Sequence, residues 1–117
     1  MFGYFKRKKE DKLLMEAGSI IGKGLLLENY NSDDAHKISL CAMDLLYKNI
    51  LEIDGQPWVL AVRAMSILRN ELIKEKVDDG IDDTLKDLII LSLPNARENA
   101  NSTDLMILDS IERVCVK

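Results

Sequence analysis

Residues 57–76 read PWVLAVRAMSILRNELIKEK, a pattern that predicts an α-helix with one buried face. Apolar residues recur three and four positions apart, and most of the charged residues fall on the other side. The expected buried stripe consists of Trp58, Ala61, Val62, Met65, Leu68, Leu72 and Ile73. Pro57 suits the first helical position because its missing N–H would have no partner there.

Two helices are predicted before this segment. Residues 10–29 show the same spacing but contain three glycines, each of which lowers helix stability by roughly 1 kcal/mol relative to alanine. Gly18 and Gly22 share one face, so a close contact with a neighbouring helix would offset that cost. The polar residues 29–34 are typical of a loop that ends in a helix cap, and a second helix is expected to run from there to about residue 51.

Two more helices are predicted after it. The first follows the break at Gly80 and is expected to end at Pro94, since proline disrupts a helix interior. Residues 95–101 are polar and predict a loop, followed by a last helix capped by Ser102 or Thr103. No segment shows a convincing β alternation. The chain is therefore predicted to be all-α, with residues 10–117 forming one compact bundle of about five helices.

The second and fourth helices carry more apolar residues than one buried face needs. Leu40, Met43 and Tyr47 lie beside the main stripe of the second helix, and Leu91 and Leu93 beside that of the fourth. A helix that is apolar on two sides is usually central or pairs with another chain. Both a homodimer and a monomer with a broad core are consistent with this surplus.

Residues 1–9 form a tip in which aromatic side chains run directly into basic ones. Its members are Phe2, Tyr4, Phe5, Lys6, Arg7, Lys8 and Lys9. Residues 1–12 sum to +3, and the other 105 residues sum to −7 of the total charge of −4. The acidic body favours a basic protein as partner and makes nucleic acid an unlikely one.

The tip has several possible roles. It could be a frayed terminus whose aromatic residues pack on the bundle, or it could bind a partner protein or nucleic acid. It could make weak contact with a membrane surface, where each basic residue contributes about 1 kcal/mol. It could instead fold back onto the acidic body of its own chain or of a dimer mate.

Nothing in the sequence predicts an active site. His36 is the single histidine, and Cys41 lies five residues further on, so the two do not share a helical face. Cys41 and Cys115 are far apart and belong to no CxxC motif, which favours free thiols in a reducing compartment. No segment reaches the roughly 18 apolar residues of a transmembrane helix, and no secretory signal is recognised, so a cytoplasmic location is expected.

Four aspartates form an acidic cluster before the fourth helix: Asp78, Asp79, Asp82 and Asp83. A calcium loop that starts at Asp78 would place Lys86 and Ile89 at ligand positions, so that motif fails. Glu71 and Glu75 precede the cluster, but no second ExxE or ExxD element accompanies them. The aspartates are therefore interpreted as the start of a helix, where they also form a candidate site for a basic partner.

These observations predict a small non-enzymatic protein that docks a helical or acidic surface onto another protein, as an inhibitor, immunity-type protein or adaptor does. No cofactor or metal is expected. Two alternatives remain open. One is a peripheral membrane protein that uses residues 1–9, and the other is a metal-dependent nucleotide hydrolase built on Glu71, Glu75 and the aspartates.

Overall fold

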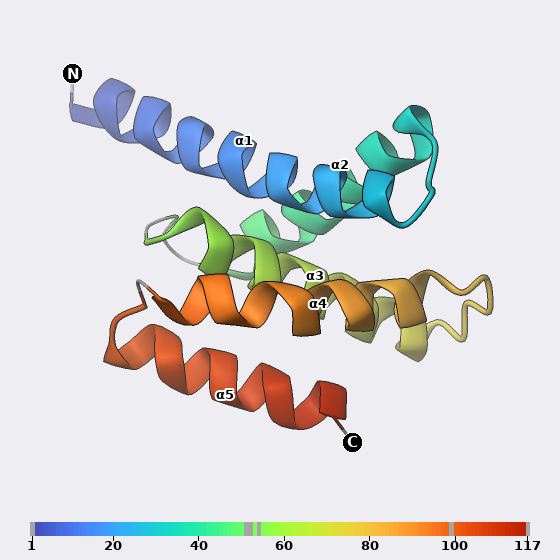
Figure 1. Cartoon of the computed structure of the whole chain (residues 1–117). Coiled ribbons are helices and arrows are strands. Elements are labelled where there is room, and N and C mark those ends of the chain that lie inside the picture. Colours follow the sequence, from blue (N-terminus) through green and yellow to red (C-terminus); the bar gives the residue numbers. More distant parts are fainter. Residues whose placement is uncertain (1, 51–52, 54, 99, 117) are drawn as a thin grey trace.

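The described part of the chain forms five helices (Figure 1). The computed structural model describes residues 2–50, 53, 55–98 and 100–116, and the side chains among them except those of residues 2–8 and 116. The helices are α1 (Phe2–Leu27), α2 (Ser32–Asn49), α3 (Pro57–Lys74), α4 (Ile81–Glu98) and α5 (Ser102–Val116). No strand occurs in these ranges, so the predicted all-α bundle is confirmed.

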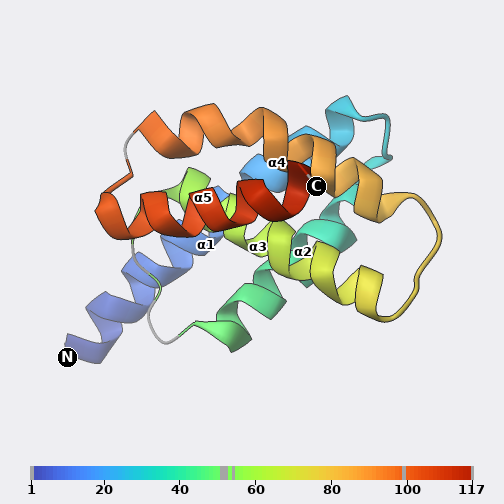
Figure 2. The ribbon, with the colours of Figure 1, turned by 90° about the horizontal axis from the view of Figure 1, so that it is seen from below.

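Helix α3 is the centre of the bundle, because it packs against each of the other four helices. Helices α1 and α2 cover one side of α3, α5 covers the opposite side, and α4 lies alongside (Figures 1 and 2). The whole measures 45 × 32 × 25 Å. The two apolar sides of α2 were consistent with α2 being the central helix. In the structure the central helix is α3.

The buried surface of α3 is wider than the predicted stripe. Its buried residues are Val59, Leu60, Ala61, Val62, Ala64, Met65 and Leu68, and four of them are consecutive. Trp58 and Ile73 were expected in the core but are 36% and 48% exposed. They stand in the first and last turns of α3, at the ends of the bundle, where fewer helices cover them.

Helix α4 does not end at Pro94 but continues to Glu98, so the predicted end is wrong. Contacts with other helices hold this last turn in place. Ala96 is buried, and the guanidinium of Arg97 donates hydrogen bonds to Asp109, at 2.7 Å, and to Glu112. The bond to Asp109, followed by that to Glu112, raises the pKa of Arg97 above its usual value. These contacts offset the hydrogen bond that proline cannot donate.

The cap of α5 is Asn101 rather than Ser102 or Thr103. Its side-chain oxygen accepts the backbone N–H of Asp104 at 2.8 Å. Asparagine and serine cap equally well, and the sequence therefore placed this boundary one residue too late.

Helix α1 begins at Phe2, well before the predicted start at residue 10. Lysine, arginine and glutamate are good helix formers, which explains why the charged segment extends the helix. The first turns of α1 project beyond the other helices (Figures 1 and 2). Among the described side chains of α1, the first buried one is Ala17. Within the described residues, no helix combines the length and apolar character needed to cross a membrane.

Candidate functional site

A tight turn places α1 and α2 side by side. Asn29 adopts a left-handed conformation with φ of 72°, and the N–H of Tyr30 reaches back to the carbonyl of Leu25 at 3.1 Å. This pattern ends a helix and reverses the chain. Asn31 then caps α2 by accepting the N–H of Asp34 at 2.8 Å.

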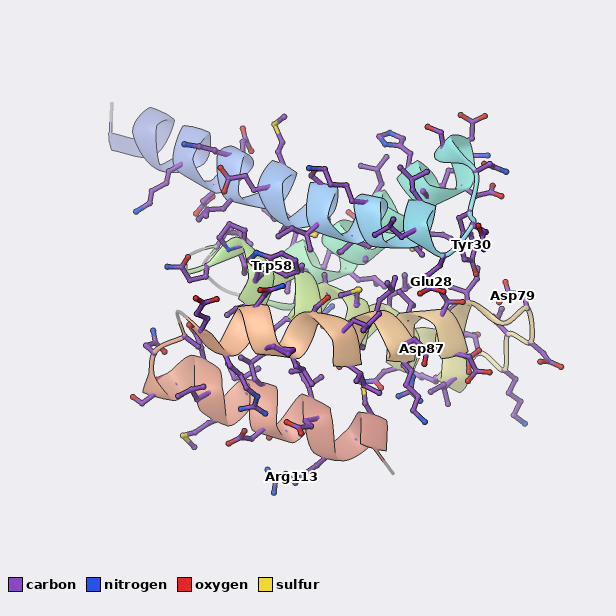
Figure 3. The ribbon with its side chains drawn as sticks, in the orientation of Figure 1. Glu28, Tyr30, Trp58, Asp79, Asp87 and Arg113 are labelled. Atoms are coloured by element: carbon purple, nitrogen blue, oxygen red, sulfur yellow. The ribbon has the colours of Figure 1, made fainter. Side chains whose placement is uncertain are left out.

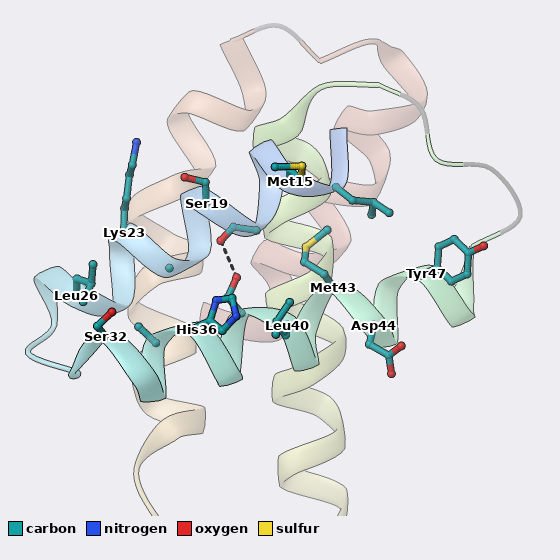
Figure 4. Close-up of a pocket in the computed structure, with 15 residues that line it drawn as sticks. Met15, Ser19, Lys23, Leu26, Ser32, His36, Leu40, Met43, Asp44 and Tyr47 are labelled. Carbon is teal, nitrogen blue, oxygen red and sulfur yellow. Dashed lines mark hydrogen bonds between the residues drawn. The ribbon is translucent and has the colours of Figure 1, made fainter. Parts of the chain in front are cut away.

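The two helices are in close contact at Gly18. Its carbonyl accepts a 2.6 Å hydrogen bond from the Ser39 hydroxyl, drawn as a dashed line in Figure 4. A Cβ atom at position 18 would lie 3.4 Å from both Met43 and Ser39. The close helix contact expected for this glycine is therefore confirmed. Gly22 lies one turn further along and has nothing within 4 Å of such a Cβ position, so it is open rather than in contact.

A groove of about 660 Å³ runs along the outer face of this helix pair (Figure 4). Its floor includes the buried side chain of Met43 and the open position Gly22. Four large apolar side chains that line it are exposed to solvent, namely Met15 (75%), Leu26 (49%), Leu40 (56%) and Tyr47 (59%). Single exposed apolar residues are common on soluble proteins, but a contiguous set around a groove is typical of an interaction surface.

Charged groups stand at both ends of the groove. Lys23 and His36 lie toward the α1–α2 turn, whereas Asp44 lies toward the other end near Tyr47 (Figure 4). Asp44 also forms an ion pair with Lys48 at 2.9 Å. Its hydrogen bond to the Lys48 ammonium raises the pKa of that lysine. The groove is thus an apolar channel with Lys23 near one end and the Asp44–Lys48 ion pair near the other.

The acidic cluster lies apart from the groove, in the α3–α4 loop and the first turn of α4. Asp79 accepts the N–H of Ile81 at 3.1 Å, and Asp82 and Asp83 occupy the first turn of the helix. These positions match the interpretation of the cluster as a helix start. In the part of the chain that is described, no three His, Cys, Asp or Glu side chains gather closely enough to hold a metal ion.

The α1–α2 turn and the α3–α4 loop lie at the same end of the molecule (Figures 1 and 2). The hydroxyl of Tyr30 donates a hydrogen bond to that of Thr84 at 3.4 Å and links the two. Glu28 and Asp79 mark this end in Figure 3. The acidic residues therefore gather opposite the projecting start of α1.

The remaining candidate residues are dispersed. His36 lies on the rim of the groove, while Cys41 is exposed on α2 and Cys115 is buried on α5. Burial raises the pKa of the Cys115 thiol, an effect that nearby Arg69 and Lys86 partly oppose. Of the tip residues, the side chains of residues 2–8 lie outside those described, and Lys9 is exposed.

Comparison of the chain with protein-family models, with curated proteins and with solved structures gave no match. The functional interpretation therefore rests on the residues and their geometry.

Sequence reasoning found part of this groove. The surplus apolar residues Leu40 and Tyr47 were recognised, as was the shared face of Gly18 and Gly22. The contribution of Met15 was missed, because Met15 falls outside the predicted buried stripe of Leu13, Leu14 and Ala17, and nothing in the sequence of α1 shows what lies beside it. Only the packing of α1 against α2 places Met15 beside Leu40 and Tyr47 around one groove.

Two glycines of α1 provide a matched test of this geometry. Replacing Gly22 with alanine should raise the free energy of unfolding by about 0.5–1 kcal/mol, because alanine favours the helix and its Cβ meets no atom. The same change at Gly24 would place a Cβ 3.0 Å from Leu88, a buried side chain, so crowding should cancel or reverse the gain.

Urea unfolding of both variants at low protein concentration measures the difference. A loss of stability in Gly22→Ala would show that the groove floor is not open as described, and an equal gain in Gly24→Ala would show that Leu88 does not crowd that position.

Proposed function

We propose that this protein is a non-enzymatic protein–protein interaction module that binds a helical surface of another chain along the α1–α2 groove. The observation that carries the proposal is the set of four exposed apolar side chains around one groove. The earlier hypothesis of an interaction module is retained, but its surface moves from the acidic cluster to this groove.

The size of the apolar surface supports binding of a protein. Met15, Leu26, Leu40 and Tyr47 are each about half exposed or more, so a partner that covers the groove would remove four large apolar side chains from water. Apolar side chains that become buried at the centre of an interface supply most of the binding free energy.

The shape of the groove favours a helical partner. Helices pack when the side chains of one fit into the gaps between side chains of the other. Between Leu14 and Leu26 the groove extends over about 18 Å, or roughly three turns of helix. An apolar helix face of that length would cover it.

Photo-crosslinking in the native host tests this function. A benzoylphenylalanine at Leu40, in the middle of the groove, should form a covalent adduct with a protein on irradiation. The same probe at Met106 is the control, because that side chain is 71% exposed on α5, on the far side of α3. Adducts of equal yield at both positions, or none at position 40, would contradict the proposal.

A second candidate function is contact with a membrane surface through the start of α1. It is favoured by the projection of the first turns of α1, which carry the aromatic and basic tip, beyond the bundle. Aromatic and basic residues together promote reversible binding to anionic lipid.

Sedimentation with anionic vesicles distinguishes this candidate. The full chain should cosediment, and a chain that lacks residues 1–9 should lose most of that binding. High salt should weaken the binding of the full chain, because the lysines and arginine act through charge. Equally negligible sedimentation of both proteins would rule out the membrane role.

A further inference from the structure

We infer that the chain bound in the groove is a second copy of this protein, arranged antiparallel so that α1 faces α1 and α2 faces α2. This inference rests on the proposed function of the groove. The result would be a symmetric four-helix interface made of two α1–α2 pairs.

The midpoint of the groove defines the position of the two-fold axis. Leu40 lies midway along the part of α2 that lines the groove, which extends from Ser32 to Tyr47. Gly18 of α1 lies at the same level, since it contacts Ser39 and Met43 on either side of Leu40. An axis through this level places the two copies of Leu40 against each other.

This arrangement brings a protruding side chain, that of Met15, to the open position at Gly22 of the other copy. Met15 lies three residues before Gly18 and Gly22 lies four residues after it, on the two sides of the axis, so Met15 of one copy comes within about one residue of facing Gly22 of the other. Met15 is the most exposed of the four groove side chains, and Gly22 is the floor position with no atom near its Cβ. The same fit occurs twice because the interface is symmetric.

Polar side chains along α2 are also self-complementary. His36 and Asp44 lie four residues on either side of Leu40, and both line the groove. In the antiparallel arrangement, Asp44 of each copy therefore faces His36 of the other, whose ring N–H can donate a hydrogen bond to the carboxylate. Lys48 pairs with Asp44 in its own copy. It lies eight residues from Leu40 and comes near the exposed Asp33 of the other copy.

The two ends of the helix pair carry opposite charges, with a basic start of α1 at one end and an acidic α1–α2 turn at the other. The positive start of α1 is separated from the acidic α1–α2 turn by the length of the helix, about 39 Å for its 26 residues. A continuous helix cannot fold back onto its own turn across that distance. In the antiparallel dimer, the start of α1, where Lys9 is exposed, lies near Glu28, Asp33 and Asp34 of the second copy.

The groove face supplies part of the area that a stable dimer buries. The lined part of α2 is about 22 Å long, and two adjacent helices are roughly 20 Å wide, which gives a contact of several hundred square ångströms per copy. Standard interfaces bury about 800 Å² per partner, and the projecting turns of α1 extend the contact toward that value.

Sedimentation equilibrium of the full chain over a range of concentrations tests the inference. The protein should associate to a dimer. Leu40→Glu places two carboxylates at the axis, and Gly22→Leu fills the position that receives Met15, so each variant should weaken dimerisation by at least about tenfold. Met106→Glu is the matched control on α5 and should leave the dimer unchanged.

A disulfide cross-link locates the interface. Leu40→Cys in a Cys41→Ser background should join two copies on mild oxidation, because residue 40 meets itself at the axis. Met106→Cys in the same background should remain monomeric on a denaturing gel.

A chain that stays monomeric at all concentrations would overturn the inference, as would a dimer that neither groove variant weakens. If the purified chain is monomeric but the probe at Leu40 captures a different protein in the host, the dimer is wrong and the proposed docking function stands. If neither a dimer nor an adduct forms, the dimer inference and the proposed docking function are both wrong.

Discussion

The bundle depends on the burial of α3 by all four other helices. Its residues 59–62 are buried at consecutive positions, which is possible only when neighbours cover more than one side of a helix. Ala61 and Ala64 are fully buried and small, so neighbouring helices can approach α3 closely. The free energy gained by removing this apolar surface from water holds the four other helices against α3.

This arrangement leaves the outer face of α1 and α2 uncovered. Each of these helices uses one side to pack on α3, and they touch each other through Gly18 and Ser39. Their remaining apolar side chains face solvent around the groove, because the described residues that line it all belong to α1 and α2. The exposed groove between α1 and α2 is thus a direct consequence of how these two helices bury α3.

The sequence predicted the fold class and most helices, since their periodicities reflect local geometry. It was less successful where contacts between helices decide the outcome. Helix α4 continues past Pro94 because Arg97 is held by α5, and Trp58 is partly exposed because its turn lies at the end of the bundle. The groove was predictable only in part, because the excess apolar residues of α2 indicated an extra surface without indicating that Met15 of α1 would share it.

Methyl NMR of the native methionines tests the central claim, that the α1–α2 face is where the protein binds another copy of itself. The chain has five methionines, among which Met15 and Met43 line the groove, Met65 lies in α3 and Met106 is exposed on α5. With rising protein concentration, the resonances of Met15 and Met43 should shift or broaden while those of Met65 and Met106 remain constant. Changes confined to Met106, or no changes at any methionine, would contradict the account.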